Sequence, residues 1–307
     1  MTFRPRFVTI ILILLSLYIR QSPSVSAQAT EEADPRATVL QAFETIHHES
    51  YHFTLASTTV TTYTLKNSQS FTAVGIYSSS GQVAANGDYH DAIVLKTGTT
   101  LKGTQNSPAF QMERTVVNGE TYLNLPSNLL TYLQLLKVDA GWWHYSDLVR
   151  KIDDAQLQMG IDALVNFPMP SIIPIANGNV NNATEDETKT IDNRVLRVYD
   201  LELKDMDYLL AQRPGTSIRT LIDALKAQDL LSSVDSSFNT QFLLGADDDR
   251  LYRIENESQV LFRDLSTSAN SSPNIDQLKI KTTSTYTLDY PDQTVTITLP
   301  DSSLLNH

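Results

Sequence analysis

The sequence predicts an α+β protein in which one large antiparallel sheet is covered by a few helices. Most of the chain from residue 51 onward alternates apolar and polar residues with the period of two that strands require. The connections between these runs are too short for the crossovers that join parallel strands. Apolar residues at helical spacing are confined to an N-terminal segment and to the middle of the chain.

The first residues have the pattern of an export signal. Two arginines precede the 13-residue apolar run "FVTIILILLSLYI", and small residues follow in an A-x-A arrangement. We interpret residues 1–29 as a secretory signal peptide, cleaved after Ala29 or Ala27. Arg20 leaves open the alternative that the run is retained as an uncleaved anchor. In either case we expect an extracytoplasmic protein, which is periplasmic, secreted or at the cell surface.

Composition excludes several classes of function. The chain has no cysteine, which excludes disulfides, thiolate metal sites, cysteine nucleophiles and a lipid-modified cysteine. Its net charge of −12 disfavours a nucleic acid as partner. No low-complexity linker divides the rest of the chain, so we expect residues 30–307 to form a single domain.

The first helix is predicted within residues 33–50, where Asp34 can cap it and Pro35 takes the first helical position. The strand "YHFTLASTTVTTYTL" follows at 51–65, and one of its faces is unusual. Small hydroxyl residues interrupt its apolar row, which a close-packed core would not usually contain. The strand therefore either lines a cavity or crosses a sheet with both faces partly wet. This face carries Tyr51, Phe53, Leu55, Ser57, Thr59, Thr61, Tyr63 and Leu65.

Further strands are predicted on both sides of a helical insertion. The Asn118-Gly119 pair predicts a type I′ hairpin turn, and the adjacent Trp142 and Trp143 should point to opposite faces of a strand. Ser146-Asp147 is expected to cap a helix with an apolar stripe, and an Asn-rich loop at 177–186 should follow. The remaining predictions are strands at 70–79, 81–90, 91–97, 109–117, 189–204, 239–245, 250–264, 275–290 and 293–300, and short helices at 205–212 and 217–231.

Catalytic signatures are absent from the sequence. It has no G-x-S-x-G elbow, no P-loop and no H-E-x-x-H motif. The cluster "HHESYH" at 47–52 could be a metal site, but we interpret it as a polar corner, because the helix should end between His48 and His52. Asp247-Asp248-Asp249 is interpreted as a hairpin tip and not as a calcium loop. We predict a protein that is not an enzyme and has no metal or cofactor.

The order of elements resembles a known family. The hairpin "V-x-G-x-x-Y…W" and the strand "D-x-R-L-Y-R" resemble the LppX/LprG type of exported lipoprotein, within the superfamily of LolA- and LolB-like lipoprotein carriers. The resemblance implies that the sheet curves into an unclosed half-barrel, that helices cover its concave face, and that lipid-like ligands bind between them. This chain departs from the LppX/LprG pattern because it lacks the cysteine that carries the lipid anchor.

This resemblance predicts a noncatalytic carrier or binder of a hydrophobic ligand, such as a lipid, an acyl chain or a lipidated molecule, with transient contact to a membrane. The alternative is an envelope sensor or protein-interaction domain of the RseB-like type, with an envelope protein as partner. The expected ligand-binding residues are Phe53, Leu55, Tyr122, Trp142, Trp143, Leu157, Ile161, Leu164, Tyr199, Leu201, Tyr252 and Tyr286.

Overall fold

The computed structural model describes residues 34–65, 68–100, 108–135, 137–152, 158, 161, 180–203, 234–263 and 275–306. The expected signal peptide and the predicted helices at 205–212 and 217–231 lie outside these residues. Among the helices that the structure describes, none is long and apolar enough to cross a membrane.

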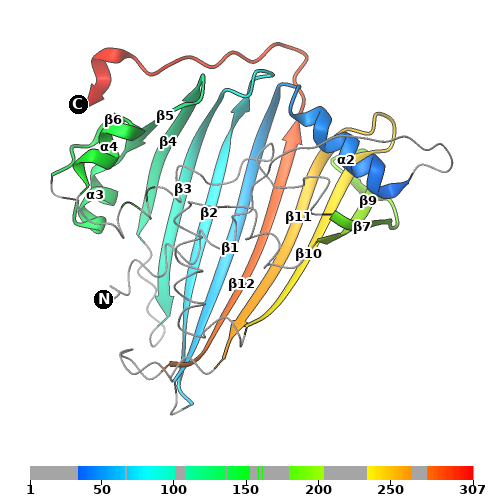
Figure 1. Ribbon diagram of the computed structural model, residues 1–307, viewed down its shortest axis with the longest axis horizontal. Coiled ribbons are helices and arrows are strands. Elements are labelled where there is room, and N and C mark those ends of the chain that lie inside the picture. The colour runs from blue at the N-terminus through cyan, green and yellow to red at the C-terminus, as the bar shows by residue number, and fades with distance from the viewer. Residues whose placement is uncertain are drawn as a thin grey trace.

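A single sheet of 13 strands dominates the described residues (Figure 1), and every strand pair is antiparallel except the short pair of β13 with β6. Its order is β13-β6-β5-β4-β3-β2-β1-β12-β11-β10-β9-β7, with β8 paired to β9. The sheet is unclosed, since β13 and β7 lie at opposite edges, so the predicted α+β class with a large open antiparallel sheet is confirmed. The strands are β1 (Tyr51–Leu65), β2 (Ser70–Val83), β3 (Tyr89–Thr100), β4 (Ala109–Val117), β5 (Glu120–Leu125), β6 (Gly141–His144), β7 (Val180–Glu185), β8 (Lys189–Ile191), β9 (Arg194–Leu203), β10 (Val234–Gly245), β11 (Leu251–Phe262), β12 (Ile275–Asp289) and β13 (Leu305–Asn306).

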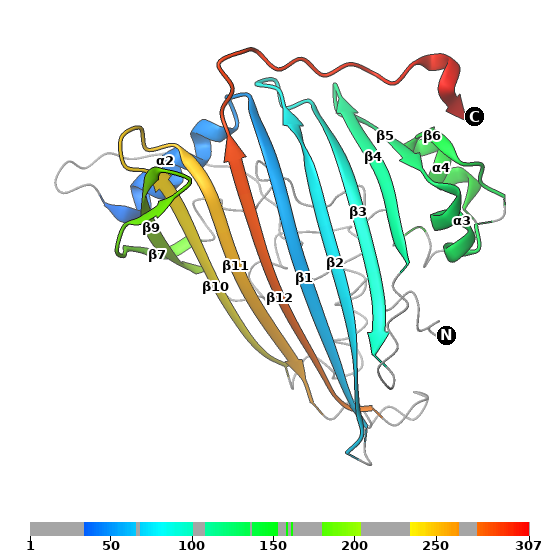
Figure 2. The ribbon, with the colours of Figure 1, turned by 180° about the vertical axis from the view of Figure 1, so that it is seen from behind.

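Within the part of the chain that the structure describes, three α-helices lie near the two lateral edges of this sheet. Helix α2 (Pro35–Ile46) lies beside β7, β9 and β11, and the short helices α3 (Ser127–Leu133) and α4 (Tyr145–Lys151) lie at the opposite side with β5 and β6 (Figures 1 and 2). The buried residues of all three helices join the same core cluster as one face of the central strands. The helices therefore pack on one face of the sheet.

Local sequence signals account well for α2 and the first strands. Asp34 accepts a hydrogen bond from the backbone N–H of Arg36 at 3.0 Å, and Pro35 opens the helix, as predicted. Strand β1 then buries alternate residues, and the face with Tyr51 and Phe53 is the buried one. Asn118 and Gly119 have φ values of 53° and 81°, which confirms the predicted hairpin turn.

Two predicted boundaries are wrong for local reasons. The Ser and Gly cluster at 78–81 does not break the chain, because β2 continues through it to Val83. Helix α4 begins at Tyr145, with the extended His144 in the capping position, and not at Ser146-Asp147. The Ser146 hydroxyl instead contacts the His144 ring at 2.8 Å.

Two other predictions are wrong because pairing partners are distant in sequence. Part of the expected loop at 177–186 forms the edge strand β7, which pairs with β9 and buries Val180 and Ala183. The predicted strand at 293–300 is an unpaired extended segment, because β1 and β11 already flank β12 and leave no free edge beside it. The chain instead runs along one end of the sheet to the 3-10 helix Ser302–Leu304 and β13 (Figures 1 and 2).

Candidate functional site

Most of the predicted ligand-binding residues that the structure describes meet on one face of the sheet, which we call the inner face. They are buried and belong to one continuous core cluster together with the helices. They come from strands on both sides of the β1–β12 pair and from one residue beyond α4. These residues are Phe53, Leu55, Trp143, Ile161, Tyr199, Leu201 and Tyr286.

The other predicted residues are not brought to this face. Tyr122 and Trp142 alternate with the buried Leu123 and Trp143 on paired strands, so they are half-buried on the opposite face. The two tryptophans thus point to opposite faces, as predicted. Tyr252 packs in a separate cluster with Leu196, Val198 and Leu243. Leu157 and Leu164 lie outside the described residues.

A row of residues in register on adjacent strands crosses the inner face from β6 to β12, and we call it the packed row. Strand register aligns its members, one from each successive strand, and bulky residues occupy its two ends. Its members are Trp143, Leu123, Arg114, Asp91, Gly81, Phe53 and Leu288.

The centre of the packed row is a buried ion pair that the sequence analysis did not predict. Asp91 and Arg114 are both 0% exposed. Arg114 Nε donates to Asp91 Oδ1 and Nη2 donates to Oδ2, each at 2.9 Å. The Ser79 hydroxyl also donates to Oδ2 at 2.6 Å. Burial disfavours the charge of Arg114, but the Asp91 carboxylate outweighs this effect and raises the pKa of Arg114 above its ordinary value.

Gly81 allows this ion pair to lie close to the neighbouring strand. A Cβ atom at position 81 would come within 2.7 Å of the Asp91 Cβ, which is closer than van der Waals contact. The register of β2 and β3 pairs these two residues directly. The inward position of Asp91, in step with Ile93 and Leu95, was the sequence signal that could have revealed the pair.

The middle of the inner face has a different composition. Small Ser and Thr residues, all buried, occupy it from β3 to β10, and we call this group the hydroxyl band. Thr59 and Thr282 share a hydrogen bond of 3.0 Å between their hydroxyls, and Thr240 donates to Asn256 Oδ1 at 3.1 Å. The band consists of Ser57, Thr59, Thr61, Thr97, Thr240, Ser258, Thr282 and Ser284.

Ser57 is the distinctive member of the hydroxyl band. The residue is 3% exposed, and its hydroxyl has no hydrogen-bond partner among the described residues. Strand register places it between Tyr77 on β2 and Ser284 on β12. The pKa values of Tyr77 and of nearby Tyr286 are raised because burial disfavours their charged forms. The site therefore offers uncharged oxygen groups.

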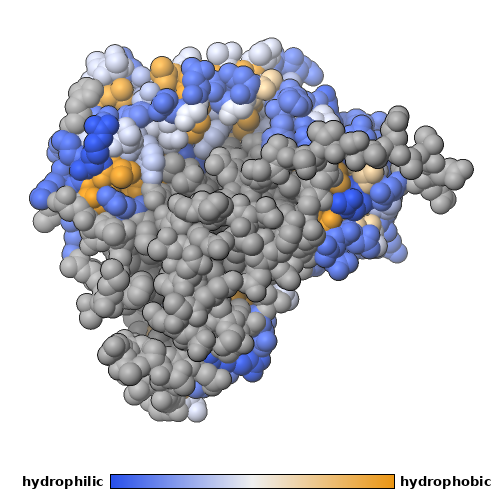
Figure 3. Space-filling model, in the orientation of Figure 1, coloured by the Kyte–Doolittle hydropathy of each residue, from blue (hydrophilic) through white to orange (hydrophobic). Residues whose placement is uncertain are grey.

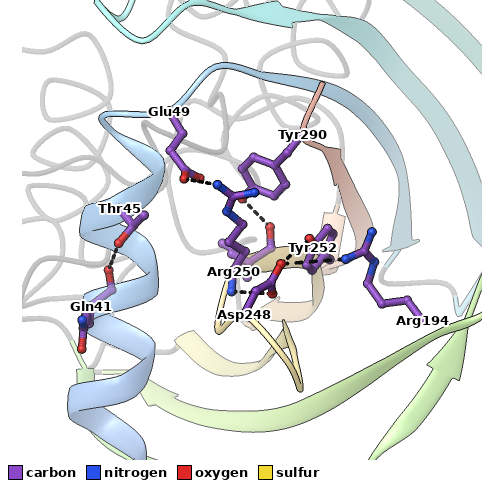
Figure 4. A network of polar contacts seen from close by, with 9 residues as sticks. Gln41, Thr45, Glu49, Arg194, Asp248, Arg250, Tyr252 and Tyr290 are labelled. Carbon is purple, nitrogen blue, oxygen red and sulfur yellow. Dashed lines mark hydrogen bonds and ion pairs between the residues drawn. The ribbon is translucent and has the colours of Figure 1, made fainter. Parts of the chain in front are cut away.

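The cluster around Tyr252 forms a structural network at one corner of the sheet (Figure 4). The Tyr252 hydroxyl donates to Asp248 at 2.7 Å, and the Arg194 guanidinium lies 3.7 Å from the centre of the Tyr252 ring. Burial, followed by the contact with Asp248, raises the pKa of Tyr252 to about 12. Arg250 joins the same corner to the end of α2 through an ion pair of 2.8 Å with Glu49. Tyr252 is not part of the inner face because side chains alternate along β11 and the adjacent Leu251 belongs to the inner cluster.

The "HHESYH" segment is a corner and not a shared face. The predicted helix end between His48 and His52 is wrong, because α2 ends at Ile46, before both residues. Burial lowers the pKa of His47. Over the residues that the structure describes, no three His, Cys, Asp or Glu side chains are grouped so that they could hold a metal ion.

On the visible described surface, hydrophobic residues form small groups between hydrophilic ones (Figure 3).

Comparisons with solved structures find matches of low sequence identity and low TM-score. A LolA superfamily protein from Nitrosomonas europaea is 10% identical, with 89% of this chain and 98% of that chain covered and a TM-score of 0.23. LprF from Mycobacterium bovis is 12% identical, with coverages of 89% and 99% and a TM-score of 0.30. A DUF1329 family protein from Desulfovibrio piger is 9% identical, with coverages of 85% and 95% and a TM-score of 0.26.

The LolA superfamily is also the one that the order of elements in the sequence resembles. No protein-family model and no curated protein matches this chain. At these identities and TM-scores the similarities carry no argument about ligand or activity, so a functional proposal has to depend on the geometry of the inner face.

Proposed function

We propose that this protein is a noncatalytic, extracytoplasmic binder or carrier of a hydrophobic ligand, which it holds against the inner face of the sheet. The observation that carries this proposal is the contrast within that face. Aromatic and aliphatic residues are buried in one continuous cluster, but small hydroxyl residues occupy the middle of the sheet, where a close-packed core would have bulky aliphatic ones.

Small side chains on long strands leave volume above the sheet without weakening the strands. Threonine keeps a high strand propensity, whereas leucine or phenylalanine at the same positions would fill the space above the backbone. Apolar residues such as Leu55 and Tyr286 lie directly next to the hydroxyl band and can remove an acyl chain from water. Each Å² of apolar surface that is buried contributes about 25 cal/mol before ordering costs are subtracted.

The proposal also includes export and transport. The basic and apolar pattern of residues 1–29 supports location outside the cytoplasm. A carrier needs to release its ligand at a membrane, so we expect transient membrane contact.

Ligand binding can be tested on the purified protein by native mass spectrometry and by titration with 11-(dansylamino)undecanoic acid, a fluorescent acyl probe. We expect co-purified lipid or saturable binding of the probe. Thr282→Leu should reduce probe affinity, because it adds bulk in the hydroxyl band. Thr283→Leu is the matched control, since Thr283 is exposed on the other face of the same strand.

A protein that carries no lipid and does not bind the probe would contradict the proposal. Co-purification of a specific envelope protein in place of a lipid would favour the sensor or interaction alternative.

A further inference from the structure

The hydroxyl band contains a group of four residues with regular geometry. Strand register pairs Ser57 with Ser284 and Thr59 with Thr282 across the β1–β12 boundary. Neighbouring strands are about 5 Å apart, and residues i and i+2 on one strand are about 7 Å apart. The backbone positions of the four residues therefore mark a patch of about 5 Å by 7 Å, which is the size of a glycerol unit or a single sugar ring, and the Thr59 and Thr282 hydroxyls approach each other within it to 3.0 Å. We call these four residues the hydroxyl patch.

Among the described residues of this patch, the Ser57 hydroxyl is an unsatisfied hydrogen-bonding group. It is buried and has no partner among the residues that the structure describes. A buried polar group without a partner is destabilising, so native proteins rarely retain such a group. An oxygen atom of a bound ligand would supply the missing partner.

The charge of the inner face restricts which oxygen this can be. The buried charges described on this face near the patch are Asp91 and Arg114, and they neutralise each other through two hydrogen bonds. Their row crosses β1 at Phe53, which is separated from Ser57 by Leu55 on the same face. An anionic headgroup at the patch would be buried without a countercharge from the band, which is very costly. An uncharged hydroxyl or ester oxygen has no such cost.

We propose that the hydroxyl patch is a hydrogen-bonding subsite for the uncharged oxygen groups of an acylated polyol, whose acyl chain lies along the apolar residues beside it. This inference rests on the proposed function and deepens it, because it assigns a polar, neutral part of the ligand to the middle of the sheet. Ser57, Thr59, Thr282 and Ser284 select this class of ligand against plain acyl esters and hydrocarbons.

The test compares monopalmitoylglycerol with methyl palmitate, which share the palmitoyl ester and differ by the two hydroxyl-bearing carbons of the glycerol. Each competes with the dansyl probe for the purified protein. We expect wild-type protein to bind monopalmitoylglycerol more tightly. Thr59→Val with Thr282→Val should reduce its affinity about 3- to 10-fold, the effect of losing one or two hydrogen bonds. The same double variant should change the affinity for methyl palmitate less than about twofold.

Two further variants make the result specific. Ser57→Ala removes the unpartnered hydroxyl without adding volume, and we expect it to reduce monopalmitoylglycerol affinity selectively. Thr58→Val with Thr283→Val is the matched control, because these residues form the neighbouring cross-strand pair on the outer face. The control should behave as wild type toward both lipids.

The outcomes separate the two proposals. Equal affinity for both lipids, unchanged by the patch variants, would overturn the subsite and leave hydrophobic ligand binding intact. Failure of the wild-type protein to bind either lipid or the dansyl probe would overturn both.

Discussion

The packed row and the hydroxyl band cross the same face of the same sheet, and both are buried, but they are built in opposite ways. The packed row combines a large aromatic residue, a bidentate ion pair and a glycine that admits it. The hydroxyl band has small neutral side chains and contains a buried hydroxyl without a partner among the described residues. Burial alone therefore does not distinguish the two regions. They differ in side-chain volume and in hydrogen-bond satisfaction.

The contrast also separates two roles for polar residues inside one sheet. In the packed row, every charge has a specific partner, so removal of one group leaves another uncompensated. In the hydroxyl band, isosteric replacement of both members of a pair leaves no group behind. The following predictions test whether stability depends on the packed row and ligand binding on the band.

The largest effect is expected from breaking the ion pair. Arg114→Met leaves the Asp91 carboxylate buried without its countercharge, and we expect a loss of about 3–5 kcal/mol in the free energy of unfolding. Urea denaturation followed by tryptophan fluorescence measures this loss. Asp91→Leu combined with Arg114→Met should restore most of the stability, because no unpaired charge remains. A cost below about 1 kcal/mol for the single variant would show that the pair does not stabilise the packed row.

A similar loss is expected at the end of the packed row. Trp143 is 2% exposed and its indole N–H donates to the Asp139 carbonyl at 2.8 Å, so Trp143→Ala should cost about 3–5 kcal/mol. Trp142→Ala should cost about 1 kcal/mol, since Trp142 is half-buried on the other face. Thermal melts and probe titrations on both variants provide the comparison. Small, equal effects of both substitutions on both measurements would contradict this difference. A larger loss of probe affinity than of stability for Trp143→Ala would assign this side chain to the ligand space.

A moderate effect is expected from adding one methyl group. Gly81→Ala forces a Cβ against the backbone carbonyl of His90 and against Asp91, and such overpacking should lower the free energy of unfolding by about 1–3 kcal/mol. Ser80→Ala is the control, because Ser80 is exposed on the other face of β2 and should change stability by less than about 0.5 kcal/mol. Equal urea midpoints for the two variants would mean that β3 at His90 and Asp91 is not tightly packed against Gly81 of β2.

The smallest effect on stability is expected in the hydroxyl band. Thr59→Val combined with Thr282→Val removes a hydroxyl pair and keeps its shape, so the free energy of unfolding should change by less than about 1 kcal/mol or increase. Urea denaturation of this double variant completes the comparison. A loss of about 3 kcal/mol, as expected for the packed row, would show that the two regions do not differ in their contribution to stability.

Short-range sequence signals correctly predicted several elements of the fold. The Asp34 cap, the Asn118-Gly119 turn and the alternation of β1 depend on residues close together in the chain, and all three are confirmed. The sequence also placed Ser57, Thr59 and Thr61 on the same face of β1 as the apolar residues, and in the structure all three are buried on that face. Alternation on β6 predicted that Trp142 and Trp143 would point apart.

The sequence alone therefore predicted the first helix and most of the strands, and which of their residues share a face, but it missed the edge strand β7 and the helix α3. Only the tertiary structure decided which strands are neighbours, because the backbone hydrogen bonds of a sheet are the same for any pair of strands. That choice pairs β1 with β12, which brings Thr59 beside Thr282, and it aligns Asp91 with Arg114 across β3 and β4. Local patterns in the sequence indicate which face Asp91, Ser57 and Thr59 occupy, but the packed row and the hydroxyl patch form only through these registers between strands.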